Sequence, residues 1–189
     1  MERQTDNQQR KVNDIELAWL AGLWDGEGSI GMKVESYKNR SDGQHTYFAP
    51  YAQVVNTHEP TLEIVDVILK KIQVGHHISW PRPHQHPNGT LPVSNYKSMW
   101  SVRIHGLKRC KVLLEFLRPF LVTKHDQAEL VWEFIVSRES HQYMRLPYTA
   151  RETEIVNTFR LRRHGGKPTQ SLKSLNDYTQ GTLAYSVKV

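Results

Sequence analysis

Two carboxylates stand one residue apart in the glycine-rich stretch Asp25-Gly26-Glu27-Gly28, which follows an apolar run. The two glycines favour the end of a helix, which would place both acids at a helix C-terminus. The helix dipole is negative at that end and disfavours each carboxylate by roughly 0.3–1 kcal/mol. A divalent cation would reverse this balance, since Mg²⁺ prefers carboxylate and carbonyl oxygens. The residues alone leave two interpretations open: a metal site, or a solvated helix end with two harmless acids.

The run that leads into these acids has the spacing of an amphipathic helix. Its apolar stripe consists of Leu17, Leu20, Leu23 and Trp24. Either Asn13 or Asp14 can cap its N-terminus, so we predict a helix over residues 14–26. Beside the stripe lie three small residues, Ala18, Ala21 and Gly22. Since glycine inside a helix costs about 1 kcal/mol relative to alanine, Gly22 indicates a close contact with a second helix, which small residues permit.

The stretch LAGLWDGEG, residues 20–28, resembles the motif that names the LAGLIDADG homing endonucleases. It departs from that motif at Trp24, Gly26 and Glu27. At the last of these, one acid replaces another. A second segment, LRPFLVTKHDQA over residues 117–128, is similar to the segment that precedes the last core helix of the family. The two matches occur in the family's order, which argues against chance similarity. The resemblance covers roughly residues 14–140.

The rest of the chain predicts a sheet covered by helices. Residues 29–37 and 45–56 alternate between apolar and polar side chains, which is typical of half-buried strands, and a turn is expected over 39–43. Further helices are expected over 60–74, ended by Gly75, and over 107–116, 125–138 and 151–163, with strands over 76–80 and 97–105. This order predicts an α+β fold with an antiparallel sheet and helices on one face. The LAGLIDADG fold has the same αββαββα order.

Three regions are expected along the chain: a flexible N-terminal arm over 1–12, an endonuclease core over 13–140, and a C-terminal helix with a basic tail over 141–189. The net charge of +6 and the pI of about 9.4 favour a polyanionic partner such as DNA. The basic tail is open to two interpretations, a solvated segment or a phosphate contact.

Cys110 is the only cysteine, which excludes an intrachain disulfide and a cysteine-rich zinc site. We interpret it as a small buried filler in a protein of a reducing compartment. The polar N-terminus lacks the apolar core of a signal peptide, and no stretch reaches the ~18 apolar residues of a membrane span. We therefore expect an intracellular, non-secreted protein without a membrane partner.

The motif occurs once, and the family's single-motif members form homodimers. The resemblance therefore implies a two-fold dimer in which the motif helix packs on its mate. The expected interface residues are Ala18, Ala21, Gly22 and Asp25.

The resemblance also implies the roles of the site residues. Glu27 would be the direct metal ligand, with the Gly26 carbonyl beside it, for Mg²⁺ or for Mn²⁺ as a substitute. Asn56 matches an amide that orients water, and Lys124 matches a lysine near the reacting phosphate. Pro60 stands where some relatives have an arginine. That role would be vacant, or taken by Lys70 or Arg103.

The polar face of the sheet is the predicted DNA-reading surface, because a twisted antiparallel ribbon fits the major groove. Its candidate DNA-binding residues are Lys33, Glu35, Tyr37, Tyr47, Tyr51, Gln53, Ser101 and Arg103. Four histidines, His76, His77, His84 and His86, fit no standard zinc spacing and favour a DNA-facing loop.

These features predict a site-specific homing endonuclease that binds a long pseudo-palindromic duplex as a homodimer. By the resemblance, it would cut both strands with Mg²⁺, leave 3′ overhangs, and serve the mobility of an intron or intervening sequence. One alternative is a non-cleaving binder of the same fold, either an RNA-splicing maturase or a DNA-binding regulator. A third hypothesis, a structural dimerisation module, is disfavoured by the Lys124 match.

Overall fold

The computed structural model describes residues 11–39, 43–79, 99–140 and 147–163. Its elements follow the predicted order, with a short 3₁₀ turn, η1, after the third helix. They are α1 Asp14–Glu27, β1 Gly28–Asn39, β2 Gly43–Asn56, α2 Glu59–Lys71, β3 His77–Ser79, β4 Trp100–His105, α3 Leu107–Leu117, η1 Arg118–Phe120, α4 His125–Ser140 and α5 Ala150–Arg163. The predicted α+β class and αββαββα order are confirmed. Most of the predicted turn over 39–43 lies outside the described residues.

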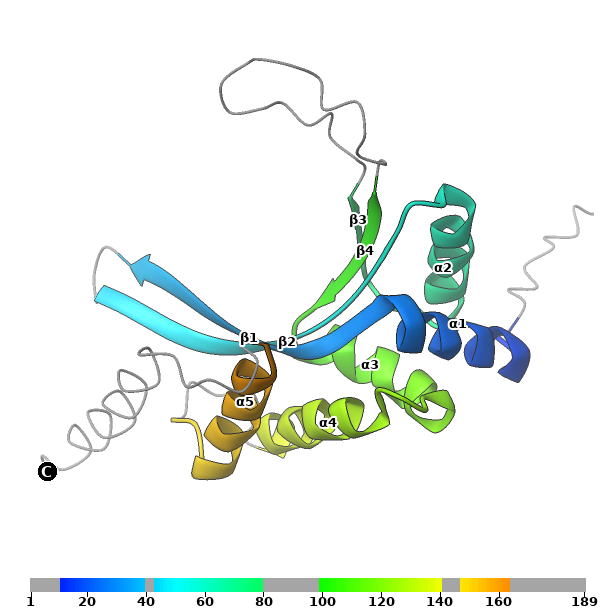
Figure 1. Cartoon of the computed structure of the whole chain (residues 1–189). Helices are drawn as coiled ribbons and strands as arrows, with labels where there is room; N and C mark the ends of the chain where they lie inside the picture. Colours follow the sequence, from blue (N-terminus) through cyan, green and yellow to red (C-terminus); the bar gives the residue numbers. More distant parts are fainter. Residues whose placement is uncertain (1–10, 40–42, 80–98, 141–146, 164–189) are drawn as a thin grey trace, which may run out of the picture.

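The strands form one antiparallel sheet in the order β1-β2-β4-β3. The register pairs Ile30 with Ala52, and Ala52 with Ile104, and all three residues are buried. Because paired residues point to the same face of a sheet, this row marks the face that packs on the helices. Figure 1 shows a strongly curved sheet with α3 and α4 beneath its convex side. The alternate residues of each strand line the concave side.

Helix α1 begins with a reciprocal cap. The Asn13 side chain accepts the N–H of Glu16 at 2.9 Å, and the Glu16 carboxylate accepts the N–H of Asn13 at 3.1 Å. This capping box decides between the two predicted caps in favour of Asn13. At its other end the helix passes directly into β1 at Gly28. A Cβ at Gly28 would lie 2.6 Å from Cδ1 of Trp24, so only glycine lets the strand begin this close to the helix.

In the predicted helices over 60–74 and 125–138, the apolar side chains that recur at helical spacing are buried. They are Leu62, Val65, Ile68, Leu69 and Ile72 before the turn into β3, and Ala128, Val131, Phe134 and Ile135 on α4. Cys110 on α3 is buried among them, as predicted, and burial raises the pKa of its thiol to about 12. None of the helices in the described ranges combines the length and the apolar character that crossing a membrane requires.

The end of α2 differs from the prediction. The helix ends before Gly75, because Gln73 takes the left-handed conformation with φ +57°. The N–H of Val74 donates to the Leu69 carbonyl at 2.9 Å, and the N–H of Gln73 donates to the Lys70 carbonyl at 3.1 Å. These two bonds form a Schellman motif. The motif carries Val74 into the core, where it is 3% exposed. Its burial offsets the cost of a left-handed non-glycine residue, roughly 1–2 kcal/mol.

Helix α5 shares the core of the preceding helices. Its N-terminus has a second capping box, since the N–H of Glu152 donates to Thr149 Oγ1 at 3.1 Å and the N–H of Thr149 donates to Glu152 Oε2 at 2.9 Å. The buried Glu152 carboxylate also lies 3.6 Å from a guanidinium nitrogen of Arg138 on α4. Just before the cap, the Tyr148 ring stacks on Phe48 of β2 with centroids 4.2 Å apart. The predicted helix over 151–163 is therefore present, and it is packed against the sheet and α4.

Candidate active site and nucleic-acid interface

The C-terminus of α1 meets one end of the sheet, and the three predicted catalytic residues lie there. Glu27 is the last residue of α1, and the next residue begins β1 and pairs with Val54 of β2. Asn56 ends β2 just beyond that pair, so it lies at the same end of the sheet. Lys124, in the segment before α4, reaches the same place, because its ammonium group donates to the main-chain carbonyl of Asp25. Three separate parts of the chain, namely α1, the end of β2 and the segment before α4, thus bring Glu27, Asn56 and Lys124 to the same end of the sheet.

Asp25 is held within its own chain. Its carboxylate accepts the N–H of Val122 at 2.7 Å and the N–H of Lys124 at 2.9 Å. Burial acts to raise the pKa of Asp25, but hydrogen bonds from the amides of Val122, Lys124 and Thr123 and from the Thr123 hydroxyl outweigh it, and the pKa lies below 3.8. Asp25 therefore fastens α1 to the segment between η1 and α4. The amides that it caps belong to its own chain, not to a partner across the predicted dimer interface.

Glu27 has the opposite surroundings. It is exposed, and within the described part of the chain its carboxylate has no hydrogen bond or ion pair. Gly26 beside it is also exposed, and a Cβ there would meet no atom within 4 Å. The described residues contain no group of three His, Cys, Asp or Glu side chains that could hold a metal by itself. One open carboxylate and one carbonyl fit Mg²⁺, which is often held by one or two carboxylates together with water and substrate phosphates.

The side-chain amide of Asn56 is hydrogen-bonded through its oxygen. Its Oδ1 accepts the N–H of His58 at 2.8 Å, in the turn that leads into α2. Asn56 therefore helps to form the turn after the strand, but this contact uses only its side-chain oxygen. The side-chain NH₂ keeps two donors, and the hydrogen bond to His58 fixes its orientation.

The exposed side of α1 bears two of the predicted interface residues. Ala18 and Gly22 are exposed, and a Cβ at Gly22 would meet no atom within 4 Å. Nothing in the described chain therefore requires glycine at position 22. Ala21 is different, since it has no exposed surface and packs in the core. This burial removes Ala21 from the residues that can contact a partner.

The same side of α1 borders an apolar groove of about 530 Å³ between α1 and α2. Its exposed apolar residues are Ile15 and Trp19 of α1 and Ile64 and Val67 of α2. Pro60, at the position without the family's arginine, also lines this groove. Of the two candidate replacements, Lys70 is paired with Asp66 at 2.7 Å, whereas Arg103 is exposed on the sheet.

All eight predicted DNA-binding residues lie on one face of the sheet. The pairs Glu35–Tyr47, Tyr37–His45 and Gln53–Arg103 fix this face, and Lys33, Tyr51 and Ser101 occupy positions of the same parity on their strands. Ser101 is only 6% exposed, which leaves its hydroxyl little surface for a DNA contact. The Tyr37 side chain lies outside the described part of the chain.

Neighbouring side chains on this concave face contact one another. The Lys33 ammonium lies 4.8 Å from the centre of the Tyr51 ring, and the Tyr51 and His105 rings stack with centroids 6.5 Å apart. The Tyr47 hydroxyl donates to the Glu35 carboxylate. His105 was not among the predicted DNA-binding residues. The alternation of β4, which puts Val102 and Ile104 in the core, already placed it on the polar face.

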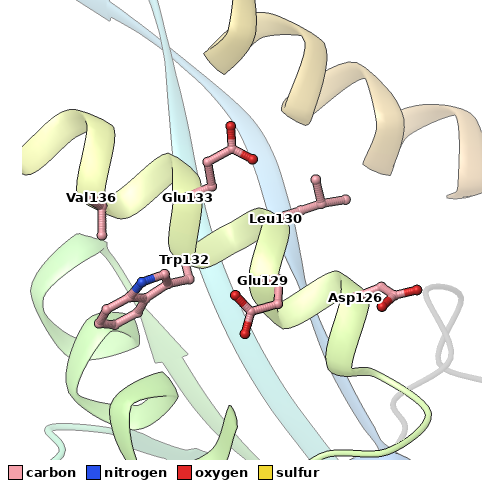
Figure 2. Close-up of a pocket in the computed structure, with 6 residues that line it drawn as sticks. All are labelled: Asp126, Glu129, Leu130, Trp132, Glu133 and Val136. Carbon is pink, nitrogen blue, oxygen red and sulfur yellow. The ribbon is translucent and has the colours of Figure 1, made fainter.

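A hollow of about 540 Å³ lies elsewhere, on the outer side of α4 (Figure 2). All six residues that line it come from this one helix. Three of them are acids: Asp126, Glu129 and Glu133. Arg118 forms two hydrogen bonds to Glu129, and Arg151 forms two to Glu133. These arginines neutralise two of the three acids, and the hollow lies on the helix side of the sheet, away from the concave face that bears the predicted DNA-binding residues, so it is not our candidate for the nucleic-acid interface.

The histidine-rich segment is only partly described. His84 and His86 lie outside the described residues. His76 is nearly buried, with Nδ1 2.8 Å from the Val74 carbonyl and Nε2 2.7 Å from Asp66 Oδ1. Its two ring nitrogens are thus occupied by a structural contact between α2 and the segment before β3.

Several solved structures share this fold. The archaeal intron-encoded homing endonuclease I-Vdi141I, complexed with DNA, matches with a TM-score of 0.55 and 14% identity over 78% of this chain and 83% of its own. The homing endonuclease I-TnaI matches with a TM-score of 0.51 and 16% identity over 91% of this chain and 98% of its own. The LAGLIDADG meganuclease I-AabMI, bound to uncleaved DNA, matches with a TM-score of 0.57 and 17% identity over 87% of this chain and 48% of its own, so this chain spans about half of its length.

No protein-family model matches the sequence, and no curated protein does. The fold and the motif at the end of α1 nevertheless point to the same relatives, since the solved structures that match are homing endonucleases. This chain has the fold of the LAGLIDADG homing endonucleases.

Proposed function

We propose that this chain is a site-specific DNA endonuclease that acts as a homodimer with Mg²⁺ and cuts both strands of a duplex. The observation that carries the proposal is the contrast at the end of α1: the Asp25 carboxylate is satisfied by backbone amides, whereas Glu27 is exposed without a partner in the described chain. A carboxylate left open beside an unobstructed glycine, at one end of a polar sheet face, is suited to hold a cation against a phosphate.

The exposed side of α1 supports the dimer. Ala18 and the open position at Gly22 offer a surface on which a second α1 can approach closely. In a two-fold arrangement the same surface serves both protomers, and the two α1 C-termini come together. Each protomer then contributes one Glu27, which matches one acid to each strand of the duplex.

Each residue near the helix end has a definite task in the proposed reaction. Mg²⁺ supplies Lewis-acid stabilisation of the charge that develops at the phosphate, and Glu27 with the Gly26 carbonyl would hold it. The Lys124 ammonium, fixed by the Asp25 carbonyl, adds a positive charge at the same place. The oriented NH₂ group of Asn56 can donate to the oxygen of an attacking water.

The concave face of the sheet would bind the duplex. Side chains of Lys33, Tyr51, Gln53 and Arg103 lie on this face, and arginine and glutamine can form paired hydrogen bonds to base edges in the major groove. A dimer that touches about ten phosphates should show a slope near −9 for log affinity against log salt. The matched structures of I-Vdi141I and I-AabMI are both DNA complexes, which is consistent with this use of the fold.

Cleavage of a randomised duplex library in Mg²⁺, followed by sequencing of the ends, tests the proposal. We expect double-strand breaks within a defined pseudo-palindromic sequence, with short 3′ extensions. A sequence recovered in this way should also identify the insertion site of an intron or intervening sequence that the endonuclease mobilises.

The variant Glu27→Gln should keep DNA binding and lose cleavage, because it preserves the shape of the side chain and removes its charge. Glu115→Gln on α3 is the matched control, since Glu115 is exposed and lies on the helix side of the sheet. It should cut like the wild type. Binding without breaks in either Mg²⁺ or Mn²⁺ would instead favour a maturase or a DNA-binding regulator.

A further inference from the structure

A row of side chains crosses the concave face at a distance from the proposed catalytic residues. His105 ends β4 and pairs in register with Tyr51 of β2, and the two rings stack. Lys33 of β1 completes the row, with its ammonium 4.8 Å from the centre of the Tyr51 ring. The row spans three neighbouring strands, and His105 is its only member that can change charge near neutral pH.

The charges around the His105 imidazole are mostly positive. Burial disfavours the protonated ring, and Lys33 of β1, Arg103 of β4 and Arg109 of α3 disfavour it further by Coulomb repulsion. Glu35 of β1 acts in the opposite direction, but it is outweighed. The pKa of His105 therefore lies below 6.5 in the free chain, and the ring is mainly neutral at pH 7.

We propose that His105 contacts the backbone of bound DNA and takes up a proton as the complex forms, so that the affinity for DNA rises as the pH falls. The proposal rests on the proposed function, since it requires the concave face to be the DNA-binding face. Duplex DNA carries one negative charge per ~1.7 Å of its axis. That charge offsets the repulsion from the three neighbouring cations, and a doubly protonated imidazole can donate to phosphate from either nitrogen.

The direction of the pH dependence follows from the two states of His105. Its pKa is low in the free chain and higher in the complex, so binding couples to proton uptake between those two values. Above the higher value the ring is neutral in both states, and below the lower value it is charged in both. Within this window the affinity rises by about tenfold per pH unit for each proton taken up. A dimer with two such histidines would approach about a hundredfold per unit.

The test measures DNA affinity between pH 6 and 8 by fluorescence anisotropy, with Ca²⁺ in place of Mg²⁺ so that binding is separated from cleavage. The probes are a labelled duplex recovered from the cleavage library and a labelled duplex of mixed sequence. His105→Gln retains hydrogen bonding without the charge, and His105→Lys carries the charge at every pH in this range. Circular dichroism and thermal unfolding establish that both variants are folded.

We expect the wild-type affinity to rise at least tenfold from pH 8 to pH 6. The Gln variant should match the wild type at pH 8 and lose most of that rise. The Lys variant should bind at all pH values about as tightly as the wild type does at pH 6. Calorimetry in buffers of different ionisation enthalpy should detect proton uptake with the wild type and less with either variant.

His125→Gln is the matched control. His125 is half-exposed at the start of α4, near Asp126 and Glu129, and lies off the sheet. This variant should keep the wild-type pH dependence. Binding of wild-type protein that does not vary with pH, or a Gln variant with the full rise, would overturn the role of His105 and leave the nuclease proposal intact. Absence of DNA binding by the wild type would overturn both.

Discussion

Asp25 and Glu27 are separated by one residue at the end of α1, yet they have opposite surroundings. Asp25 accepts two backbone amides from the segment between η1 and α4, and its pKa is lowered by them. Glu27 is exposed and has no partner among the described residues. The comparison shows how one short motif can divide its acids between two tasks. One acid fixes the helix end in place, and the other is left available for a ligand.

The glycines of the motif divide in the same way. Gly28 is required by its own chain, because a Cβ there would lie 2.8 Å from the Trp24 carbonyl oxygen and 2.6 Å from its ring. Gly22 and Gly26 face open space. Gly28 is therefore required by the fold of this chain. The described chain does not explain why glycine stands at positions 22 and 26, so their identity points to a partner protomer or a ligand. Substitutions of these acids and glycines test this distinction.

The largest effect on stability is expected for Asp25→Asn. An amide can accept one hydrogen bond through its oxygen, but its NH₂ group would face the N–H of either Val122 or Lys124. Charge-assisted hydrogen bonds contribute about 1.5–3 kcal/mol each, so we expect a loss of about 3 kcal/mol in the free energy of unfolding. Urea denaturation measures it.

The control for Asp25→Asn is Glu27→Gln, which should change the free energy of unfolding by less than about 0.5 kcal/mol, as for other exposed positions. If the two substitutions destabilised the protein equally, the division of tasks between the two acids would be wrong.

The next effect in size concerns Gly28→Ala. The added methyl group would press on the backbone and ring of Trp24, a residue with no exposed surface. Overpacking of this kind costs about 1–3 kcal/mol, and we expect about 2 kcal/mol because α1 and β1 must separate slightly. Thermal unfolding should detect a lower midpoint. An unchanged midpoint would mean that the junction between α1 and β1 is looser than the geometry indicates.

Much of this fold could be predicted from the sequence, because it follows from local periodicity. The alternation in residues 45–56 correctly separated Phe48 and Ala52, which are buried, from Tyr47, which is 39% exposed. The helices expected over 60–74 and 125–138 are likewise present, because a helix that must bury one face shows apolar residues at a spacing of three to four.

Features that depend on distant partners could not be predicted. The amides that Asp25 caps lie 97 and 99 residues away in sequence. The sequence placed Ala21 beside Ala18 and Gly22 as a small residue, but its burial depends on where the sheet and α3 pack. Gln73 adopts the left-handed conformation because this places Val74 in the core. The helix therefore ends before Gly75, although glycine is the residue that locally favours helix termination. In each case tertiary packing outweighs the local preference.

Low pH should weaken the contribution of Asp25 to the free energy of unfolding, which provides a further test of its hydrogen bonds. The pKa of Asp25 is lower in the folded chain than its usual value of 3.8. Its contribution to stability is therefore fully present above about pH 4 and is lost as the pH falls through the lower, folded-state value. The difference in unfolding free energy between the wild type and Asp25→Asn should shrink below pH 4. Urea titrations from pH 7 to pH 2.5 measure it, and a difference that stays constant would contradict the assigned hydrogen bonds.

The smallest effect on the free energy of unfolding is expected for Gly22→Ala. This substitution tests whether the exposed side of α1 is free or packs against a second protomer. In the isolated protomer the added Cβ meets no atom within 4 Å, and replacement of a helical glycine by alanine stabilises the helix by about 1 kcal/mol. If a second α1 packs against this position, the same methyl group should weaken the dimer, which sedimentation at several protein concentrations would detect.

Val136→Ala, on the outer side of α4, is the control, because it also improves helix propensity and leaves α1 untouched. A Gly22→Ala protein with higher stability, wild-type association and wild-type cleavage would rule out close helix packing at this residue. Association that weakens while the protomer stays folded would show that Gly22 serves the partner rather than its own chain.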